Sequence, residues 1–294
     1  MALAPRAVVV SRPSELTELT VRHGTLAAAQ FFLRGRGQDL ALLRERHENL
    51  SSALAAIAHA IPADWRRGAV NRDDLSRFLF SPQDVVIVVG QDGLVANVAK
   101  YLRNGQPVVG VNPDHTYNPG VLVQNEPDAV RDLLADAVRG AGQSRTLVAA
   151  TLDDGQRLIG LNEIYLGHPS HQSARYVVRC EDRQERQSSS GLVVGTGTGA
   201  TGWAASIAAD RQHAVRFPQP DELALWWFVR EAWASPTTGN TVTNGVLSGG
   251  HVLRIVSESD ELTIFADGIE ADHLTAGWGQ RVEVSVADER LRLL

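Results

Sequence analysis

The sequence predicts an α/β N-terminal domain with a parallel sheet over residues 1–144 and a β-rich C-terminal domain over residues 145–294. In the first part, short apolar runs alternate with helical segments as far as residue 139, a pattern typical of a parallel sheet covered on both faces. From residue 146 the pattern becomes that of short alternating strands, after a stretch at 140–144 that we interpret as the boundary. A chain of 294 residues is long enough for both domains.

Buried strands with helices between them are predicted for the first domain. The run Val85–Val89 is apolar throughout and stops at Gly90, as expected of a strand buried on both faces. Ser14 has the side chain of a helix N-cap. Strands are expected at 7–11, 85–89 and 108–111, and helices from Ser14 onward and at 39–59, 94–103 and 126–139.

The second domain is predicted to consist mainly of strands. Residues 146–151 and 157–165 are expected to form a hairpin, because the Asp154-Gly155 pair between them favours positive φ. Further strands are expected at 174–180, 191–195, 223–229, 250–257, 261–266 and 281–286.

Composition excludes several classes of protein. Hydrophobic residues at 44% and charged residues at 21% are typical of a soluble globular protein. A net charge of −6 gives no electrostatic footprint for nucleic acid. The single cysteine, Cys180, excludes an intramolecular disulfide and favours a cytoplasmic location. No apolar run approaches the ~20 residues that span a bilayer, and no signal-peptide pattern is present, so no membrane partner is expected.

The turn after Val89 has the composition of a phosphate site. Gly90 and Gly93 flank Gln91 and Asp92, and a helical segment follows, so backbone N–H groups can face an anion. A carboxylate such as Asp92 repels phosphate unless it holds a metal ion or takes a proton from an attacking hydroxyl, which indicates phosphoryl transfer. Alternatively, the turn merely joins strand to helix, because short glycine motifs are weak signals.

Two later stretches suggest a nucleotide pocket. Asn162 and Glu163 are adjacent in a strand-like run, and ribose hydroxyls are suitable partners for such a buried polar pair. The loop at 195–203 alternates glycine and threonine and ends in Trp203, a combination suited to a purine nucleotide. It matches neither a Rossmann fingerprint nor a Walker loop. The alternatives are a solvated edge strand and a flexible loop.

Five motifs, taken in their order and spacing, resemble those of the NAD kinase family. They are GQDG at Gly90–Gly93, GVNPD with the following NPGVL, LNE at Leu161–Glu163, SSGLVVGTGTGATGW at Ser189–Trp203 and ADG at Ala266–Gly268. Together they cover most of the chain from about residue 84 to 270. The Thr-Gly-Thr-Gly loop with its tryptophan and the GVNPD loop are closer to the divergent, mitochondrial-like branch than to the common bacterial enzymes.

The resemblance implies a NAD kinase-like two-domain fold and a phosphotransferase. Such an enzyme transfers a phosphoryl group from ATP, or from polyphosphate, to the 2′-hydroxyl of the adenosine ribose of NAD and so makes NADP. Mg²⁺ would be held mainly by the donor phosphates, without a metal site of the protein itself. The family also implies a homodimer or homotetramer.

Site residues follow from the same resemblance. The aspartate of the family's glycine turn lies near the acceptor hydroxyl, which makes Asp92 the expected catalytic residue. The Asn-Glu pair holds the dinucleotide, and the threonines and aromatic residue of the glycine-threonine loop hold its adenosine. The expected binding residues are Gly90, Gly93, Asn112, Asn162, Glu163, Thr196, Gly197, Thr198, Thr201, Trp203 and Asp267.

Four positions differ from the family pattern. Gln91 replaces the second glycine of the turn, and Leu94 replaces the threonine that commonly follows it. Ser190 stands for an aspartate and Ala200 for a serine in the motif at Ser189–Trp203. Two alternatives to a NAD kinase therefore stay open: a related kinase acting on a lipid, sugar or nucleoside, and a dinucleotide-binding sensor without catalysis.

Overall fold

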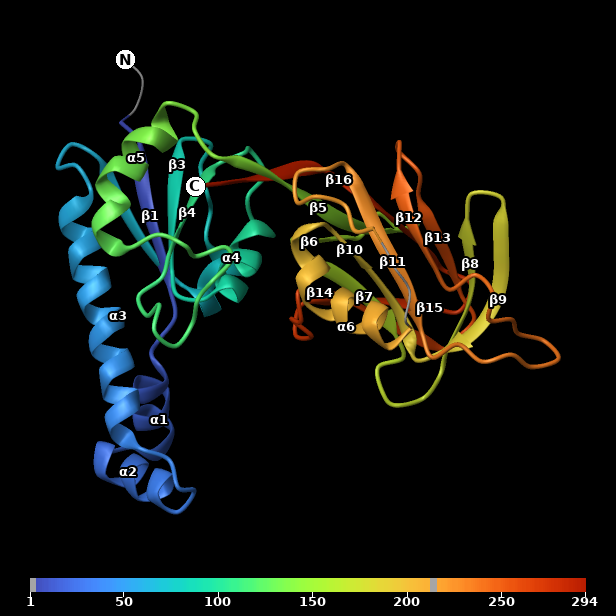
Figure 1. Cartoon of the computed structure of the whole chain (residues 1–294), viewed down its shortest axis with the longest axis horizontal. Helices are drawn as coiled ribbons and strands as arrows, with labels where there is room; N and C mark the ends of the chain where they lie inside the picture. Colours follow the sequence, from blue (N-terminus) through green and yellow to red (C-terminus); the bar gives the residue numbers. More distant parts are fainter. Residues whose placement is uncertain (1–3, 212–215) are drawn as a thin grey trace. The chain divides into compact units, whose positions relative to one another are not determined.

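The protein, described here by a computed structural model for residues 4–211 and 216–294, consists of two compact units (Figure 1). The first unit comprises Met1–Gln143 together with Arg292–Leu294, and the second comprises Ser144–Leu291. The first is an α/β unit and the second is built mainly of strands, which confirms the predicted fold class.

A parallel sheet forms the centre of the first unit. Its strands are β1 (Arg6–Ser11), β2 (Arg66–Asn71), β3 (Asp84–Val89) and β4 (Pro107–Val111), in the spatial order β2-β1-β3-β4. All three neighbouring pairs are parallel. The chain leaves β1 for β2 on one side and then returns to β3 on the other. The gap between the carboxyl ends of β1 and β3 is therefore the topological switch point, where open α/β sheets bind ligands.

Helices cover both faces of this sheet, as the continuous apolar strands require. Buried side chains of α3 (Leu40–Ala60) and α5 (Val130–Val138), among them Ile57 and Leu134, pack on one face against Val85, Ile87 and Val89 of β3. The helix α4 (Asp92–Ala99) contacts β3 and β4, and its residues from Leu94 to its end are buried. Neither face of β3 is left for solvent, which is why its sequence shows no alternation.

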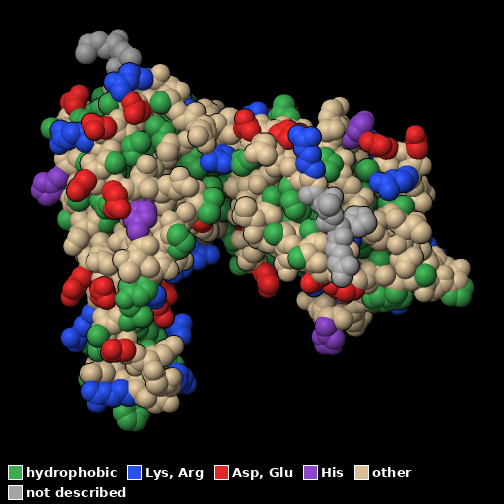
Figure 2. All heavy atoms as spheres, viewed as in Figure 1, with side chains coloured by type: hydrophobic (Ala, Val, Ile, Leu, Met, Phe, Trp, Pro, Cys, Tyr) green, Lys and Arg blue, Asp and Glu red, His purple; other side chains and the backbone are tan. Residues whose placement is uncertain are grey.

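A group of helices extends the first unit beyond the sheet. The helices α1 (Glu15–His23) and α2 (Leu26–Arg34) pack on the first turns of α3 through a separate apolar cluster that includes Leu19, Leu33 and Leu43. Ser14 caps α1 as predicted, because its hydroxyl accepts a hydrogen bond from the N–H of Thr17 at 3.2 Å. Charged side chains of both signs cover these helices (Figure 2).

The second unit contains two antiparallel layers. One sheet has the order β12-β11-β10-β7-β14-β15; strands β16, β13, β8 and β9, with β5 and β6, form the other layer. The bounds are β5 (Gln143–Leu152), β6 (Arg157–Gly160), β7 (Glu163–Gly167), β8 (Ala174–Cys180), β9 (Arg183–Ser189), β10 (Gly191–Gly195), β11 (Ala224–Arg230), β12 (Asn244–Ser248), β13 (Leu253–Ser257), β14 (Glu261–Ala266), β15 (His273–Gly277) and β16 (Arg281–Leu293). Side chains of both layers, such as Val178 and Trp227, share one core.

The fold differs from the expectations in several features, and strands β2, β12 and β15 were not expected. The expected strand 157–165 is two strands, β6 and β7, which belong to different sheets because the chain bends at Leu161 and Asn162. The strand β9 was not expected, because its sequence RQERQSS has no apolar pattern; it forms by pairing along its whole length with β8. Among the described residues, no helix is long and apolar enough to span a membrane.

Candidate functional site

The predicted glycine turn lies at the carboxyl end of β3, where the chain enters α4. Gly90 has φ +153°, a conformation that favours glycine, and its N–H donates to the carbonyl of Val111 at the end of β4. Asp92 is the first residue of α4. A Cβ added at Gly93 would meet no atom within 4 Å, so space is open beside the turn.

The Asp92 carboxylate is held by a loop that sequence analysis did not connect with it. Its Oδ1 accepts hydrogen bonds from the N–H groups of Val121, Leu122 and Val123 at 3.0, 2.7 and 3.1 Å. Its Oδ2 accepts only from Val121 among the hydrogen bonds of the described residues, at 2.8 Å. Because Oδ2 shares the Val121 N–H with Oδ1, it can accept a further donor such as a hydroxyl.

Asn112 organises the loop that follows β4. Its Oδ1 accepts from the N–H of Asp114 at 2.9 Å, and its Nδ2 donates to the carbonyl of Asn118 at 2.6 Å. The side chain is buried. The structure therefore places this predicted binding residue inside the loop 112–120, where it fixes the backbone beside the glycine turn.

A pocket of about 170 Å³ lies at the switch point of the first sheet. Arg12, directly after β1, lines it together with Gly90 and Asn112, and Arg46 and Tyr117 close it from α3 and from the loop after β4. The Arg46 guanidinium is 5.1 Å from the centre of the Tyr117 ring. Sequence analysis missed both arginines, although Arg12 stands where the first predicted strand ends.

In the second unit, Asp267 holds the predicted Asn-Glu pair. Its Oδ2 accepts from the N–H of Leu161 at 3.0 Å, and its Oδ1 accepts from Asn162 and Glu163 at 2.7 and 3.3 Å. Asp267 has φ +54°, an uncommon conformation for a residue other than glycine. These hydrogen bonds bend the chain between β6 and β7, which accounts for the two strands found where one was expected.

Glu163 lies in an electrostatically unfavourable position. Burial and the negative charge of Asp267 raise the pKa of the Glu163 carboxyl from its ordinary value to about 7. Its register partner on β10 is Gly195, so it lies beside the start of the glycine-threonine loop. A half-buried carboxyl that changes charge near neutral pH is typical of functional sites.

Thr196 and its neighbours connect the glycine-threonine loop to the Asn-Glu pair. The Thr196 hydroxyl donates to the carbonyl of Leu161 at 2.6 Å and accepts from the N–H of Thr198 at 3.1 Å. The Thr196 N–H donates to the carbonyl of Asn162 at 2.9 Å. The hydroxyl of Thr198 is buried and has no partner within the described part of the chain. Since buried polar groups are normally paired, a ligand group is a suitable partner for it.

Packing within the protein explains the glycine at position 197. A Cβ added at Gly197 would lie 2.3 Å from the carbonyl oxygen of Gln219, a distance that no structure tolerates. Gly197 therefore allows a close approach between two backbone segments of the second unit, which differs from the ligand approach expected from the sequence.

Trp203, the first residue of α6 (Trp203–Asp210), already has ring partners. Its ring stacks on Tyr165 with centroids 5.7 Å apart, and the guanidinium of Arg230 lies 5.1 Å from its centroid. It is half-buried against the cluster around Trp226. Thr201, at the end of the short helix before it, is exposed.

The structure thus joins four predicted residues of the second unit, Asn162, Glu163, Thr196 and Asp267, into one hydrogen-bonded group. In the first unit it joins Asp92 to the loop 121–123, whose backbone donors carry no signal in the sequence. Within residues 4–211 and 216–294, no group of three or more His, Cys, Asp or Glu side chains is arranged to hold a metal ion.

No protein-family model matches the chain. It is similar to the NAD kinase of Pseudomonas entomophila (strain L48) and to that of Pseudomonas putida (strain GB-1), each 29% identical over 225 residues, which cover 72% of this chain and 70% of the relative. The NAD kinase of Pseudomonas syringae pv. tomato is 28% identical over the same length.

Proposed function

The chain belongs to the NAD kinase family, and from this premise we propose that it transfers the terminal phosphoryl group of ATP, or of polyphosphate, to the 2′-hydroxyl of the adenosine ribose of NAD, giving NADP. The observation that carries the proposal is the carboxylate of Asp92. It follows a buried strand, is fixed by three backbone N–H groups, and keeps one oxygen with a free lone pair.

Asp92 acts on the acceptor hydroxyl in this proposal. Its Oδ2 accepts the hydroxyl hydrogen and orients the oxygen for in-line attack on the terminal phosphorus of the donor. As the new P–O bond forms, the bond to the bridging oxygen of the donor breaks, ADP (or a polyphosphate shorter by one unit) leaves, and the hydroxyl proton passes to the carboxylate. Positioning and charge stabilisation supply most of the catalysis in such reactions. Donor phosphate oxygens are the ligands that Mg²⁺ prefers, so we propose that it enters with the donor and neutralises its charge.

The predicted residues of the second unit bind the dinucleotide. Glu163 is suited to accept hydrogen bonds from ribose hydroxyls, and Asn162 beside it offers both a donor and an acceptor. The unpartnered hydroxyl of Thr198 supports a ligand-facing role. Thr201 and Trp203 complete the adenosine contacts in this proposal, while Thr196, Gly197 and Asp267 maintain the backbone around them. In the first unit, Gly90, Gly93 and Asn112 shape the turn beside Asp92.

The decisive experiment offers the enzyme several acceptors. The purified full-length chain is incubated with Mg²⁺, ATP and NAD, and in parallel with polyphosphate, NADH and a panel of lipids, sugars and nucleosides, and the products are identified by mass spectrometry. We expect NADP as the main product. Phosphorylation of another acceptor without NADP indicates the related kinase instead, and binding of NAD without any product indicates the sensor.

The position that carries threonine in the family bears on this choice. Leu94 is buried in α4, so its side chain packs in the core and offers no hydroxyl to a donor. Other groups therefore bind the donor phosphates. We further propose that the enzyme is cytoplasmic and forms a homodimer or homotetramer. Sedimentation analysis of the purified chain tests the oligomeric state.

A further inference from the structure

We propose that the switch-point pocket of the first unit binds the nucleoside end of the phosphoryl donor, and that Arg46 and Tyr117 make the enzyme prefer a nucleoside triphosphate to inorganic polyphosphate. The inference rests on the proposed kinase function and assigns to that reaction two residues that the sequence did not indicate.

The position of the pocket is the first argument. It lies beyond the carboxyl ends of β1 and β3, between which the strand order reverses, and its lining includes Arg12 after β1 and Gly90 and Gln91 after β3. Open α/β sheets bind ligands at such a point. Since Gln91 and Gly90 adjoin Asp92, a ligand in this pocket lies next to the carboxylate that orients the acceptor.

The size of the pocket decides which part of a donor it takes. At about 170 Å³ it is smaller than the ~300–1,000 Å³ that enclose a complete small-molecule ligand. One end of a nucleotide therefore enters, and the remainder extends along the glycine turn, where Gly93 leaves open space.

The lining indicates the nucleoside end. Leu43 and Leu50 of α3 give it an apolar wall, and Tyr117 adds an aromatic ring in contact with the flat guanidinium of Arg46. A base can stack on such a surface, whereas an inorganic polyphosphate has no apolar part to bury. Arg12 is exposed and has no hydrogen-bond or ion-pair partner elsewhere in the described ranges, so it is available to the phosphates.

Two carboxylates near Arg46 reduce the positive charge of the pocket without blocking it. Glu15 and Asp114 each lie 3.9 Å from the guanidinium of Arg46. Ion pairs of this length between partly exposed side chains are weak, so a nucleotide can replace them as partner of the guanidinium. A donor that carries Mg²⁺ also brings less negative charge to these carboxylates than a bare phosphate chain.

The test measures donor binding directly, in the full-length chain and without NAD. Calorimetry compares a non-hydrolysable ATP analogue with inorganic tripolyphosphate, both with Mg²⁺. We expect Tyr117→Ala to weaken the analogue about tenfold, the effect of losing a stacked base, and to leave tripolyphosphate unchanged. We expect Arg46→Gln to weaken the analogue by about tenfold or more, because it loses a charged hydrogen bond, and Arg46→Lys to restore part of the loss.

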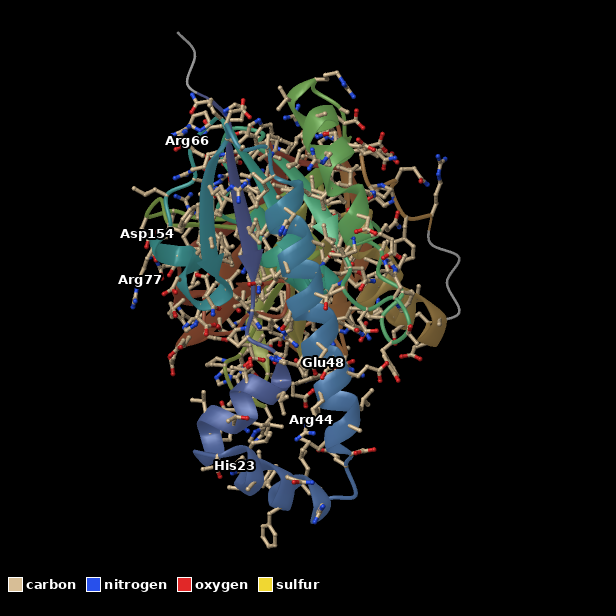
Figure 3. All side chains as sticks on the ribbon, turned by 90° about the vertical axis from the view of Figure 1, so that its left-hand side faces the viewer. His23, Arg44, Glu48, Arg66, Arg77 and Asp154 are labelled. Carbon is tan, nitrogen blue, oxygen red and sulfur yellow. The ribbon has the colours of Figure 1, made fainter. Side chains whose placement is uncertain are left out.

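Arg44 provides the matched control. It is exposed on the same helix, as Figure 3 shows, and does not line the pocket. Arg44→Gln should bind both probes like the parent chain, and melting temperatures should show that all variants fold. If Tyr117→Ala and Arg46→Gln both bind the ATP analogue normally, the pocket is not the donor site. Equal loss of tripolyphosphate in Tyr117→Ala overturns the preference for a nucleoside.

Acceptor binding and product formation separate this inference from the proposed function. Loss of NAD affinity in the two variants, with normal binding of the ATP analogue, assigns the pocket to the acceptor and overturns the inference. A chain that makes no NADP with any donor, yet shows the expected pattern of analogue binding, refutes the proposed function and keeps the donor pocket.

Discussion

Asp92 in the first unit and Asp267 in the second unit make similar hydrogen bonds with backbone N–H groups. Asp92 and Asp267 each precede a glycine, and each carboxylate accepts hydrogen bonds from three successive backbone N–H groups, at 121–123 and at 161–163. A charged acceptor facing three donors fixes a loop that has no regular secondary structure of its own. Both segments, the Val121–Val123 loop and the Leu161–Glu163 bend, thus owe their shape to one side chain each.

The difference between them lies in how the two oxygens are used. Among the described residues, Asp92 receives three backbone donors on Oδ1 and a second contact from Val121 on Oδ2. Asp267 divides its donors over both oxygens, and its charge also raises the pKa of the neighbouring Glu163. The first arrangement leaves Oδ2 able to accept a further hydrogen bond, while the second fixes the backbone and raises the pKa of a neighbouring carboxyl. Similar hydrogen bonds therefore do not imply similar functions.

Asp92→Asn should have the largest effect of the substitutions proposed here, because it tests the proposed chemical role of Asp92. The amide oxygen can still accept from Leu122 and Val123, so the fold should remain, but the proposed acceptor of the hydroxyl proton is lost. We expect turnover to fall by roughly 10²–10⁴, the range for loss of a general base. Initial rates of NADP formation and melting temperatures measure the two sides. Turnover close to that of the parent chain would remove Asp92 from the reaction.

Asp267→Ala tests whether the hydrogen bonds of Asp267 stabilise the fold. It leaves three backbone N–H groups without their acceptor, and a hydrogen bond to a charged group contributes about 1.5–3 kcal/mol. We expect the free energy of unfolding to fall by about 3 kcal/mol or more, measured by urea denaturation, and NAD affinity to fall with it. Asp267→Asn, which keeps one acceptor oxygen, should lose less. A variant that unfolds like the parent chain contradicts the assigned role.

The hydrogen bonds of Asp92 with residues 121–123 and of Asp267 with residues 161–163 could not be predicted from the sequence, for one reason. Local patterns did predict secondary structure. The apolar run Val85–Val89 predicted the strand before Asp92, and Ser14 predicted the start of a helix. These hydrogen bonds instead join Asp92 to backbone groups 29–31 residues away and Asp267 to backbone groups 104–106 residues away. Backbone N–H groups are the same in nearly every residue, so no residue type announces them. The motif pointed to Asp92 and Asp267 but not to their partners.

The glycine-threonine loop shows the reverse case. Its composition suggested close approach to a ligand, yet Gly197 is required by the backbone at Gln219. Trp203 likewise contacts Tyr165 and Arg230, two residues that lie 38 positions before it and 27 after it in the sequence. Composition identified a loop of unusual geometry, and only the packing shows which of its residues serve the protein itself.

The pKa of Glu163 predicts a pH effect on stability. In the unfolded chain this carboxyl titrates near 4.5, whereas in the folded protein its pKa is about 7 because burial and Asp267 disfavour the charge. Between these values the unfolded chain releases the proton first, so the free energy of unfolding falls as pH rises from about 4.5 to 7 and this contribution stays lost above it.

Glu163→Gln removes this titration and sharpens the comparison. A shift of that size corresponds to up to about 3 kcal/mol at pH 8. We therefore expect the variant to be more stable than the parent chain at pH 8 and little different at pH 4, by denaturation at both pH values. The same variant should bind NAD more weakly, because an amide is a poorer acceptor for ribose hydroxyls. An equal gain at both pH values would falsify the electrostatic cause.

Thr198→Val should have the smallest effect. Its informative feature is the direction of the change in the free energy of unfolding and in the affinity for NAD. The hydroxyl of Thr198 is buried and has no hydrogen-bond partner among the described residues, so valine, which has nearly the same shape, removes an unsatisfied group and should leave the free energy of unfolding unchanged or raise it slightly. If NAD supplies the missing partner, the affinity for NAD should fall by about 0.5–1.5 kcal/mol, the net contribution of one hydrogen bond.

Thr196→Val is the matched control in the same loop. The Thr196 hydroxyl already forms hydrogen bonds with Leu161 and Thr198, so this substitution should lower the free energy of unfolding and the NAD affinity together. A Thr198→Val chain that loses stability and keeps its NAD affinity would show that the Thr198 hydroxyl serves the fold alone. The dinucleotide would then be bound elsewhere, and only the proposed chemical role of Asp92 would remain to be tested.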